Sequence, residues 1–364
     1  MTGRAAVFVG PGRPLEMREY PVPDPAPDAL VVKVSLANIC GSDLHFWRGN
    51  GPKIRTDIPQ ILGHEMVGVI HKLGREVVRD SAGQPLREGD RIAYAYFSPC
   101  GACAACLTGT PGCPNRYRNW LNVSADAPPH FHGAFGDYYY LRSRHWIFRT
   151  PEGLPDRSVS PVNCAMSEAL YGLHQIGVVI GDAVVIQGAG GLGLYATAIA
   201  KEMGAGLVIT LDRFADRLAL AQQFGADRTL NVSETTPEER VEQVRAWTGG
   251  TGADVAAEFT GAPAAIDEGT RMLRFGGRYL WIGNINPGFR AEIDPGLMVR
   301  GSQGVRGVIV YEPWVIPRAL DLIRRTQARY PFDRVISHVV PFGQINEAFA
   351  LAAEGKAIRV ALQM

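Results

Sequence analysis

Residues 182–212 contain the feature that most restricts how this chain can fold. Ala183 to Gln187 is a mostly apolar run of a length typical of a strand buried on both faces. Residues 188–193 read Gly-Ala-Gly-Gly-Leu-Gly and lead into a helix. A second apolar run, Leu207 to Leu211, then ends at Asp212. This order of strand, glycine turn, helix, strand and acid predicts a parallel sheet that binds a dinucleotide.

The glycines of this turn suit contact with a dinucleotide, although an ordinary strand-to-helix turn is the alternative. Gly188 permits a tight turn, Gly190 lets the backbone approach a pyrophosphate, and Gly193 lets the helix pack closely on the strand. The N-terminus of the helix offers N–H groups and a partial positive charge to phosphates. Asp212 can accept hydrogen bonds from both ribose hydroxyls of NAD, or else cap the next helix near Ala215. The residues expected at the cofactor are Gly188, Gly190, Gly191, Leu192, Gly193, Asp212, Arg213, Arg217, Thr260 and Gly283.

Length and charge exclude several classes of function. The chain has 364 residues, enough for two domains with full cores. Its net charge of +1 gives no reason to expect nucleic acid or an anionic membrane as a partner. No apolar run approaches the roughly 20 residues of a membrane span, and no targeting segment precedes the first strand. We therefore expect a cytoplasmic protein that acts on a small molecule.

Four of the six cysteines lie close together, in the order Cys100, Cys103, Cys106 and Cys113. In a large chain without a secretory segment, such spacing indicates metal binding rather than disulfides. Four thiolates without an open coordination position describe a structural, tetrahedral zinc site. Free thiols or an iron–sulfur cluster are the alternatives.

A second metal site would need ligands from distant positions. The candidates are Cys40, His64 with its neighbour Glu65, and Cys164. Taken singly, each has an ordinary structural explanation as a buried residue. However, Cys40 is followed by Ser42 and His45, which could pass a proton in sequence. Three protein ligands with one open position are what a catalytic zinc requires.

The rest of the chain divides into three parts. Residues 1–165 read as short strands and turns, which favours a small β-barrel. Strands and helices alternate over residues 166–302, as in a doubly wound sheet. Residues 303–364 are less regular, with one helix at Trp314–Thr326, another near Ile345–Glu354 and a final strand.

Taken together, these motifs resemble the zinc-dependent medium-chain alcohol dehydrogenases over essentially the whole chain. The motifs are Cys40-Gly-Ser-Asp-Leu-His45, Gly63-His-Glu65, the four-cysteine loop, Cys164 and the glycine turn. The resemblance implies a GroES-like β-barrel catalytic domain over 1–165 and a Rossmann domain over 166–302. It further implies that residues 303–364 return to the catalytic domain, and that the protein is a homodimer or homotetramer.

The resemblance also implies roles for the site residues. Cys40, His64 and Cys164 would hold the catalytic zinc, with Glu65 near or transiently on the metal. Asp43 would orient the histidine ligand. Ser42 would take the proton of the alcohol and pass it through a ribose hydroxyl to His45, while NAD accepts hydride. The expected protein thus carries two zinc ions and NAD, and interconverts an alcohol and its aldehyde or ketone.

The substrate is less defined. Cys164 stands where polyol dehydrogenases of the family often carry a glutamate, which points to the ordinary alcohol dehydrogenases. Phe46, Trp47 and Tyr96 are expected near the metal and would form a largely aromatic pocket. The loop 114–135 is either a wall of that pocket or a surface excursion. A polyol or amino-alcohol dehydrogenase and a non-catalytic NAD-binding zinc protein are the alternatives.

Overall fold

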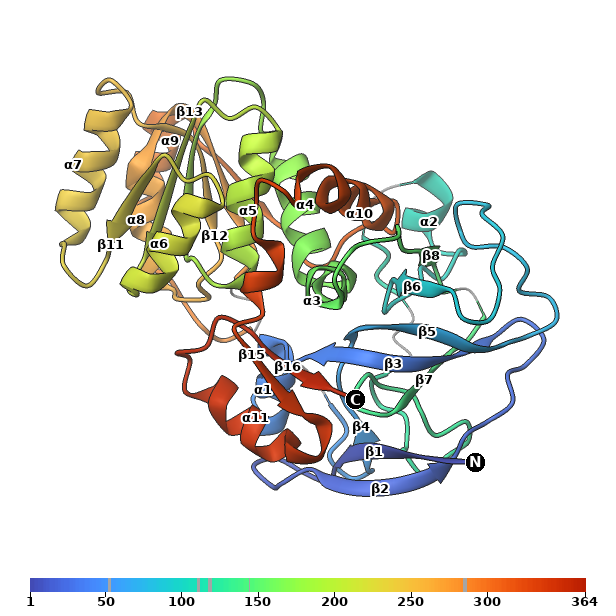
Figure 1. Ribbon diagram of the computed structural model, residues 1–364. Helices are drawn as coiled ribbons and strands as arrows, with labels where there is room; N and C mark the ends of the chain where they lie inside the picture. Colours follow the sequence, from blue (N-terminus) through green and yellow to red (C-terminus); the bar gives the residue numbers. More distant parts are fainter. Residues whose placement is uncertain (52–53, 110–111, 117–119, 144, 284–286) are drawn as a thin grey trace. The chain divides into compact units, whose positions relative to one another are not determined.

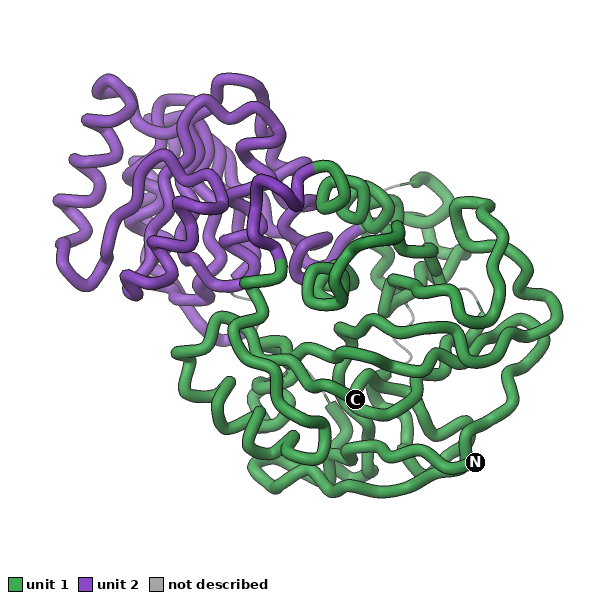
Figure 2. The backbone as a smooth tube through the Cα atoms, viewed as in Figure 1, with its two compact units in different colours: residues 1–164, 312–325, 333–364 green, residues 165–311, 326–332 purple. Residues whose placement is uncertain are grey.

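The computed structural model describes the chain except for residues 52–53, 110–111, 117–119, 144 and 284–286. The chain forms two compact units, shown in green and purple in Figure 2. Unit 1 comprises Met1–Cys164, Glu312–Arg325 and Asp333–Met364. Unit 2 comprises Ala165–Tyr311 and Thr326–Phe332.

The units differ from the expected division in two stretches after residue 302. The first stretch belongs to unit 2 because β14 (Gly304–Gly307) pairs in parallel with β13 (Leu273–Trp281). The second does so because Tyr330 and Phe332 pack on Phe224, with ring centroids 6.4 and 5.7 Å away. Strand pairing and aromatic packing, neither of which is local in sequence, thus set these boundaries.

Unit 2 is built on a six-stranded parallel sheet in the order β11-β10-β9-β12-β13-β14 (Figure 1). The remaining strands are β9 (Ala183–Gln187), β10 (Leu207–Asp212), β11 (Arg228–Asn231) and β12 (Ala253–Glu258). The helices are α4 (Ala165–Ile176), α5 (Gly191–Glu202), α6 (Ala215–Gln223), α7 (Pro237–Trp247), α8 (Ala264–Met272) and α9 (Pro295–Gly301). The strand order reverses direction between β9 and β12, which confirms the doubly wound fold expected from the sequence.

The glycine turn lies directly after β9, as its pattern predicts. Gly188 has φ of +101°, a conformation that side chains disfavour. A Cβ atom on Gly193 would lie 1.7 Å from the carbonyl oxygen of Gly188, so only glycine fits there. α5 can therefore start immediately after the strand and pack against β9 and β10.

Unit 1 is rich in antiparallel strands (Figure 1). Its larger sheet has the order β15-β16-β3-β5-β6-β8, with β7 also pairing with β3, and its smaller sheet has the order β2-β1-β4. The strands are β1 (Thr2–Phe8), β2 (Glu16–Pro21), β3 (Leu30–Asn38), β4 (Gln60–Ile61), β5 (Glu65–Leu73), β6 (Arg91–Tyr94), β7 (Tyr138–Leu141), β8 (Ile147–Arg149), β15 (His338–Pro341) and β16 (Val360–Gln363). β16 pairs antiparallel with β3, so the end of the chain completes the larger sheet.

Short helices connect these strands. They are α1 (Gly41–Arg48), α2 (Ala104–Thr108), α3 (Asp156–Val159), α10 (Val315–Thr326), α11 (Ile345–Ala353) and the 3-10 turns η1 (Ser160–Asn163), η2 (Phe332–Val335) and η3 (Phe342–Gln344). No helix was predicted for residues 41–48, although α1 carries several candidate site residues. It begins after Cys40 and ends at Gly49, whose φ of 76° stops the helix.

Candidate metal sites and active site

The dispersed metal candidates come together in unit 1. One ligand atom from each of Cys40, His64, Glu65 and Cys164 lies within 4.8 Å of the others. Cys40 lies between β3 and α1, His64 and Glu65 lie at the start of β5, and Cys164 follows η1. Three separate segments of the chain therefore supply this group, and three of its members are buried.

Asp43 holds two members of the group. Its carboxylate is fully buried; Oδ2 accepts a hydrogen bond from the Cys40 backbone N–H at 2.9 Å, and Oδ1 lies 3.6 Å from Nδ1 of His64. Burial opposes a charge on His64, but Asp43 and the Cys40 thiol outweigh it and raise the His64 pKa to about 10. Hydrogen bonding to Cys164, then to His64, lowers the pKa of Cys40 well below its usual value despite burial. Two thiols and an imidazole that a carboxylate orients are ligands of the kind that zinc takes.

Glu65 is held by a residue that the sequence analysis missed. Its Oε2 pairs with the guanidinium of Arg359, the residue before β16, and accepts a hydrogen bond from Asn38 at 3.2 Å. Burial raises the pKa of Glu65 to about 7, and the charge of Arg359 opposes that rise. Oε1 has no hydrogen-bond partner among the described residues, and one carboxylate oxygen of Glu65 lies within 4.8 Å of the ligand atoms of the other three residues. An isolated arginine at the start of an apolar strand was the only sequence signal for this pair.

Aromatic rings cover His64. Trp120 stacks on its imidazole with centroids 4.6 Å apart, and Tyr96 lies at the same centroid distance. Phe46 packs edge-on against Trp120 at 5.6 Å. Of the loop 114–135, Trp120 lies against the metal group, as expected for a wall of the pocket. Trp47 was expected there, but its ring instead packs against Phe349 of α11 and its indole N–H donates to the Arg13 carbonyl.

Ser42 and His45 lie on α1, three residues apart and therefore on one face of the helix. Both are half-buried, and Nδ1 of His45 is hydrogen-bonded to Asn50 at 3.0 Å. The helix that carries this pair begins directly after Cys40. The proposed relay and one member of the metal group therefore lie on one short segment.

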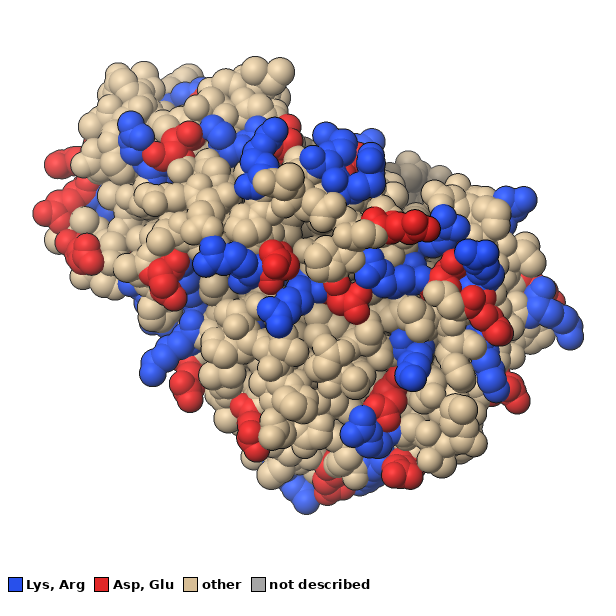
Figure 3. Space-filling view, in the orientation of Figure 1, with Lys and Arg blue, Asp and Glu red and all other residues tan. Residues whose placement is uncertain are grey.

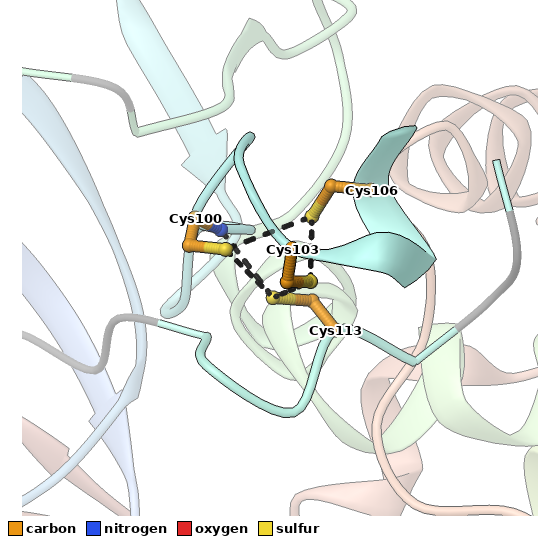
Figure 4. A group of neighbouring side chains, drawn as sticks. All are labelled: Cys100, Cys103, Cys106 and Cys113. Carbon is orange, nitrogen blue, oxygen red and sulfur yellow. Dashed lines mark hydrogen bonds between the residues drawn. The ribbon is translucent and has the colours of Figure 1, made fainter. Parts of the chain in front are cut away.

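The four clustered cysteines form a separate group (Figure 4). The sulfur atoms of Cys100–Cys113 and Cys103–Cys106 are 3.6 Å apart, and those of Cys103–Cys113 and Cys100–Cys106 are 3.8 and 3.9 Å apart. A zinc ion with tetrahedral Zn–S bonds of about 2.3 Å would separate its sulfur ligands by about 3.8 Å. The four sulfur atoms therefore fit a closed zinc site.

The expected cofactor residues lie at the carboxyl ends of strands in unit 2. Asp212, the last residue of β10, accepts hydrogen bonds from the N–H groups of Ala189 at 2.6 Å and Phe214 at 3.0 Å. Phe214, and not Asp212, occupies the N-cap of α6. The guanidinium groups of Arg213 and Arg217 lie over the ring of Phe214 at 4.6 and 4.5 Å. Both guanidinium groups thus lie close to Asp212, whose carboxylate was expected to accept hydrogen bonds from the ribose hydroxyls.

Thr260 and Gly283 follow β12 and β13. A Cβ atom on Gly188 would lie 2.9 Å from the Thr260 methyl carbon, so Thr260 packs on the glycine turn. Gly283 donates its N–H to the carbonyl of Glu258 at 3.1 Å. Glu258, which the sequence analysis did not single out, also binds the Thr260 turn through its side chain.

Fold and site together define a zinc-binding dehydrogenase with separate metal and dinucleotide units. Residues 26–152 match the alcohol dehydrogenase GroES-like domain, and residues 191–325 match the zinc-binding dehydrogenase domain. The chain is 33% identical to a 5-exo-hydroxycamphor dehydrogenase of Pseudomonas putida and 37% identical to an alcohol dehydrogenase of Rhizobium meliloti, each over 98% of this chain and 97% of the relative. It is 31% identical to an L-threonine 3-dehydrogenase of Xanthomonas euvesicatoria over 95% of both chains.

Solved structures of dehydrogenases share the fold of this chain. An alcohol dehydrogenase of Thermotoga maritima superposes with a TM-score of 0.94 at 30% identity, covering 100% of this chain and 99% of that one. A putative zinc-binding dehydrogenase of Sinorhizobium meliloti, bound to NADP, gives 0.87 at 26% identity over the whole of both chains. The chain therefore belongs to the zinc-dependent medium-chain alcohol dehydrogenase family, as its motifs indicated. The GroES-like part of the predicted fold is thereby confirmed as well.

Metal analysis tests the two groups. We expect the intact protein to hold one zinc ion at each group. Cys40→Ala should remove one ion and abolish activity while the protein stays folded. Cys103→Ala, the matched change in the other group, should instead lower the Tm, because a closed structural site contributes folding free energy. An intact protein with at most one zinc ion per chain would contradict the assignment.

Proposed function

We propose that this protein is a zinc- and NAD-dependent alcohol dehydrogenase, which interconverts an alcohol and its aldehyde or ketone by hydride transfer. The observation that carries the proposal is the convergence of Cys40, His64 and Cys164 in a buried group. Two cysteines and one histidine with an open fourth position are the catalytic zinc set already known for alcohol dehydrogenases. A zinc ion held there would polarise the substrate oxygen and lower its pKa.

The residues around this group have distinct proposed roles. Asp43 orients His64 and, through the Cys40 N–H, the first thiol. Ser42 accepts the proton of the substrate hydroxyl and passes it towards His45, which is near enough to solvent to release it. Arg359 holds one oxygen of Glu65, and the other has no hydrogen-bond partner among the described residues. NAD, when bound to unit 2, supplies the hydride acceptor.

The aromatic rings favour an alcohol with an apolar body. Phe46, Tyr96 and Trp120 surround the metal group on one side and offer dispersion contacts rather than hydrogen bonds to a polyhydroxy chain. The relative named for 5-exo-hydroxycamphor supports such a substrate. The relatives named for L-threonine keep an amino-alcohol dehydrogenase as the second candidate.

Charge at the ribose end supports NAD over NADP. A 2′-phosphate beside Asp212 would bring two negative charges within a few ångströms, which costs on the order of 1 to 4 kcal/mol. Arg213 and Arg217 weaken that repulsion, because both lie against Phe214 next to the carboxylate. One solved structure of this fold is bound to NADP and another is complexed with NADH, so the fold alone does not decide between the cofactors. We therefore propose a preference for NAD rather than strict exclusion of NADP.

The protein is proposed to act in the cytoplasm on a small molecule, without a nucleic-acid or membrane partner. On the face drawn in Figure 3, basic and acidic side chains alternate rather than forming one field. Among the residues described, no helix combines the length and apolar character needed to cross a bilayer.

A substrate panel tests the apolar pocket. We expect cyclohexanol to exceed threonine and sorbitol in kcat/KM. Trp120→Ala should lower the value for cyclohexanol by about ten- to a hundredfold, the scale of losing one buried aromatic contact. Trp47→Ala is the matched control, since that ring packs on α11, and it should leave the substrate order unchanged. A clear preference for threonine or sorbitol would favour the second candidate. No hydride transfer with any alcohol would favour a non-catalytic protein.

Cofactor choice gives the next test. NAD should exceed NADP by at least about tenfold in kcat/KM, the ratio that ~1.4 kcal/mol provides. Asp212→Gly should shrink or reverse that ratio and leave the zinc content unchanged, because Asp212 lies in unit 2 and the metal groups lie in unit 1. Equal efficiency with both cofactors in the unmutated enzyme would contradict the prediction.

Self-association is proposed as a homodimer or homotetramer. All four residues of β14 are exposed at the edge of the sheet, and Val299, Val305 and Ile309 nearby are 79%, 38% and 51% exposed. An open strand edge with apolar side chains favours pairing with a second copy. Light scattering should give a mass of at least two chains, and Val305→Lys should reduce it. A monomer at micromolar concentration would contradict this proposal.

A further inference from the structure

Glu258 occupies a central position in unit 2. It is the last residue of β12, the strand next to β9, and its side chain has no exposed surface. The strand order reverses between these two strands. In doubly wound sheets, a dinucleotide binds outside the carboxyl ends of the strands at this reversal. The carboxyl group of Glu258 therefore lies between the turns that follow β9 and β13, where a dinucleotide is expected to bind.

The side chain of Glu258 fixes the turn that follows its own strand. Oε1 accepts three hydrogen bonds, from the Thr260 N–H at 2.5 Å, the Thr260 hydroxyl at 2.7 Å and the Gly261 N–H at 2.5 Å. The Thr260 hydroxyl in turn accepts from the Ala262 N–H at 2.9 Å. One carboxyl oxygen therefore organises three consecutive residues of the turn.

The two neighbouring turns contact this segment through the Glu258 backbone and the Thr260 side chain. The Glu258 carbonyl accepts the N–H groups of Ile282 and Gly283 at 3.2 and 3.1 Å, which anchors the turn after β13. A Cβ atom on Gly283 would lie 2.5 Å from the Gly261 nitrogen and 2.7 Å from Oε1 of Glu258. On the other side, the Thr260 methyl group fills the space that a side chain on Gly188 would need. The turns after β12 and β13 thus meet at the Glu258 carboxyl group, and the turn after β9 packs on Thr260.

The carboxyl group of Glu258 contacts the turn and is not open to a ligand. Oε2 is covered and has no hydrogen-bond partner among the described residues. A buried acceptor without a donor lowers stability, and the three hydrogen bonds that Oε1 accepts from the turn offset that cost. Because the carboxyl group has no exposed surface, it cannot reach a ligand directly.

We propose that Glu258 is a positioning residue for the nicotinamide half of the cofactor. The inference rests on the proposed dinucleotide-dependent function. In this sheet, β9–β11 and the glycine turn form the half that receives the adenosine, and β12–β14 form the other half. The Thr260–Gly261 turn belongs to the second half and packs on the first through Gly188. By fixing this turn, Glu258 sets where the nicotinamide end can lie and leaves the adenosine end largely unaffected.

Calorimetric titration of the zinc-loaded full chain with NADH and with AMP separates the two halves. Glu258→Ala should raise the Kd of NADH by at least about tenfold, the scale of one hydrogen bond to a charged group. The Kd of AMP should stay within about twofold, because AMP occupies only the adenosine half. Glu258→Gln should raise the Kd of NADH by about threefold, since an amide oxygen can still accept from the turn but more weakly.

The matched control is Glu268→Ala. Glu268 is also a buried carboxylate of unit 2, but it pairs with Arg240 at 2.7 Å. Its removal should lower the Tm and leave the ratio of the NADH and AMP dissociation constants unchanged. If Glu258→Ala does not fold, the same ratio is measured in Glu258→Gln, which keeps the shape of the side chain.

The outcomes are distinct. A Glu258 variant that binds NADH as tightly as the unmutated protein, or weakens NADH and AMP by one common factor, overturns the inference and leaves the proposed function intact. If the unmutated protein binds neither NADH nor AMP, the proposed function fails and the inference fails with it. Selective weakening of NADH in the Glu258 variants, absent from Glu268→Ala, supports the positioning role.

Discussion

The buried ion pair between Glu65 and Arg359 is the interaction on which the metal group of unit 1 depends. Neither side chain has access to water sufficient to solvate a charge, so each must neutralise the other. The pair exists only because β16 lies beside β3, where Ala361 faces Asn38. The last residues of the chain are therefore part of the site, which explains in physical terms why unit 1 is discontinuous in sequence. Losing either partner would leave a buried charge unpaired at a cost of about 3–5 kcal/mol.

Buried carboxylates are also paired with donors in unit 2, where backbone N–H groups take the place of arginine. Asp212 accepts two backbone N–H groups and links the glycine turn to the turn after β10. The Glu258 carboxylate does the same for the turn after β12, while its backbone carbonyl accepts two N–H groups of the turn after β13. Strand ends leave N–H groups without partners, and a carboxylate satisfies several of them at once. Acidic residues at these ends therefore shape the turns that a dinucleotide would contact.

Local patterns were enough to predict much of the fold and the four-cysteine group, whereas the ligand set of Cys40, His64 and Cys164 rested on the family resemblance. β9 has the bounds that its apolar run predicts, and the spacing of Cys100–Cys113 implied a closed cluster. Contacts between residues far apart in the sequence could not be predicted. No pattern joins Arg359 to Glu65 across the chain, and β14 belongs to unit 2 because it pairs with β13. α1 was missed because glycine and serine at its start give little helical signal. Within α1, the 100° turn between neighbours put Phe46 towards the site and Trp47 towards α11.

The two metal groups differ in what must be folded before each can form. The four cysteines come from one short segment, so closing that loop costs little conformational entropy and their geometry is largely local. The group of Cys40, His64 and Cys164 exists only after β3, α1, β5 and η1 have packed together. Its ligand geometry is therefore a product of the tertiary fold, and the aromatic rings on His64 arrive by the same packing. Changes in the core of unit 1 should reach the chemistry of this group more directly than they reach the cysteine cluster.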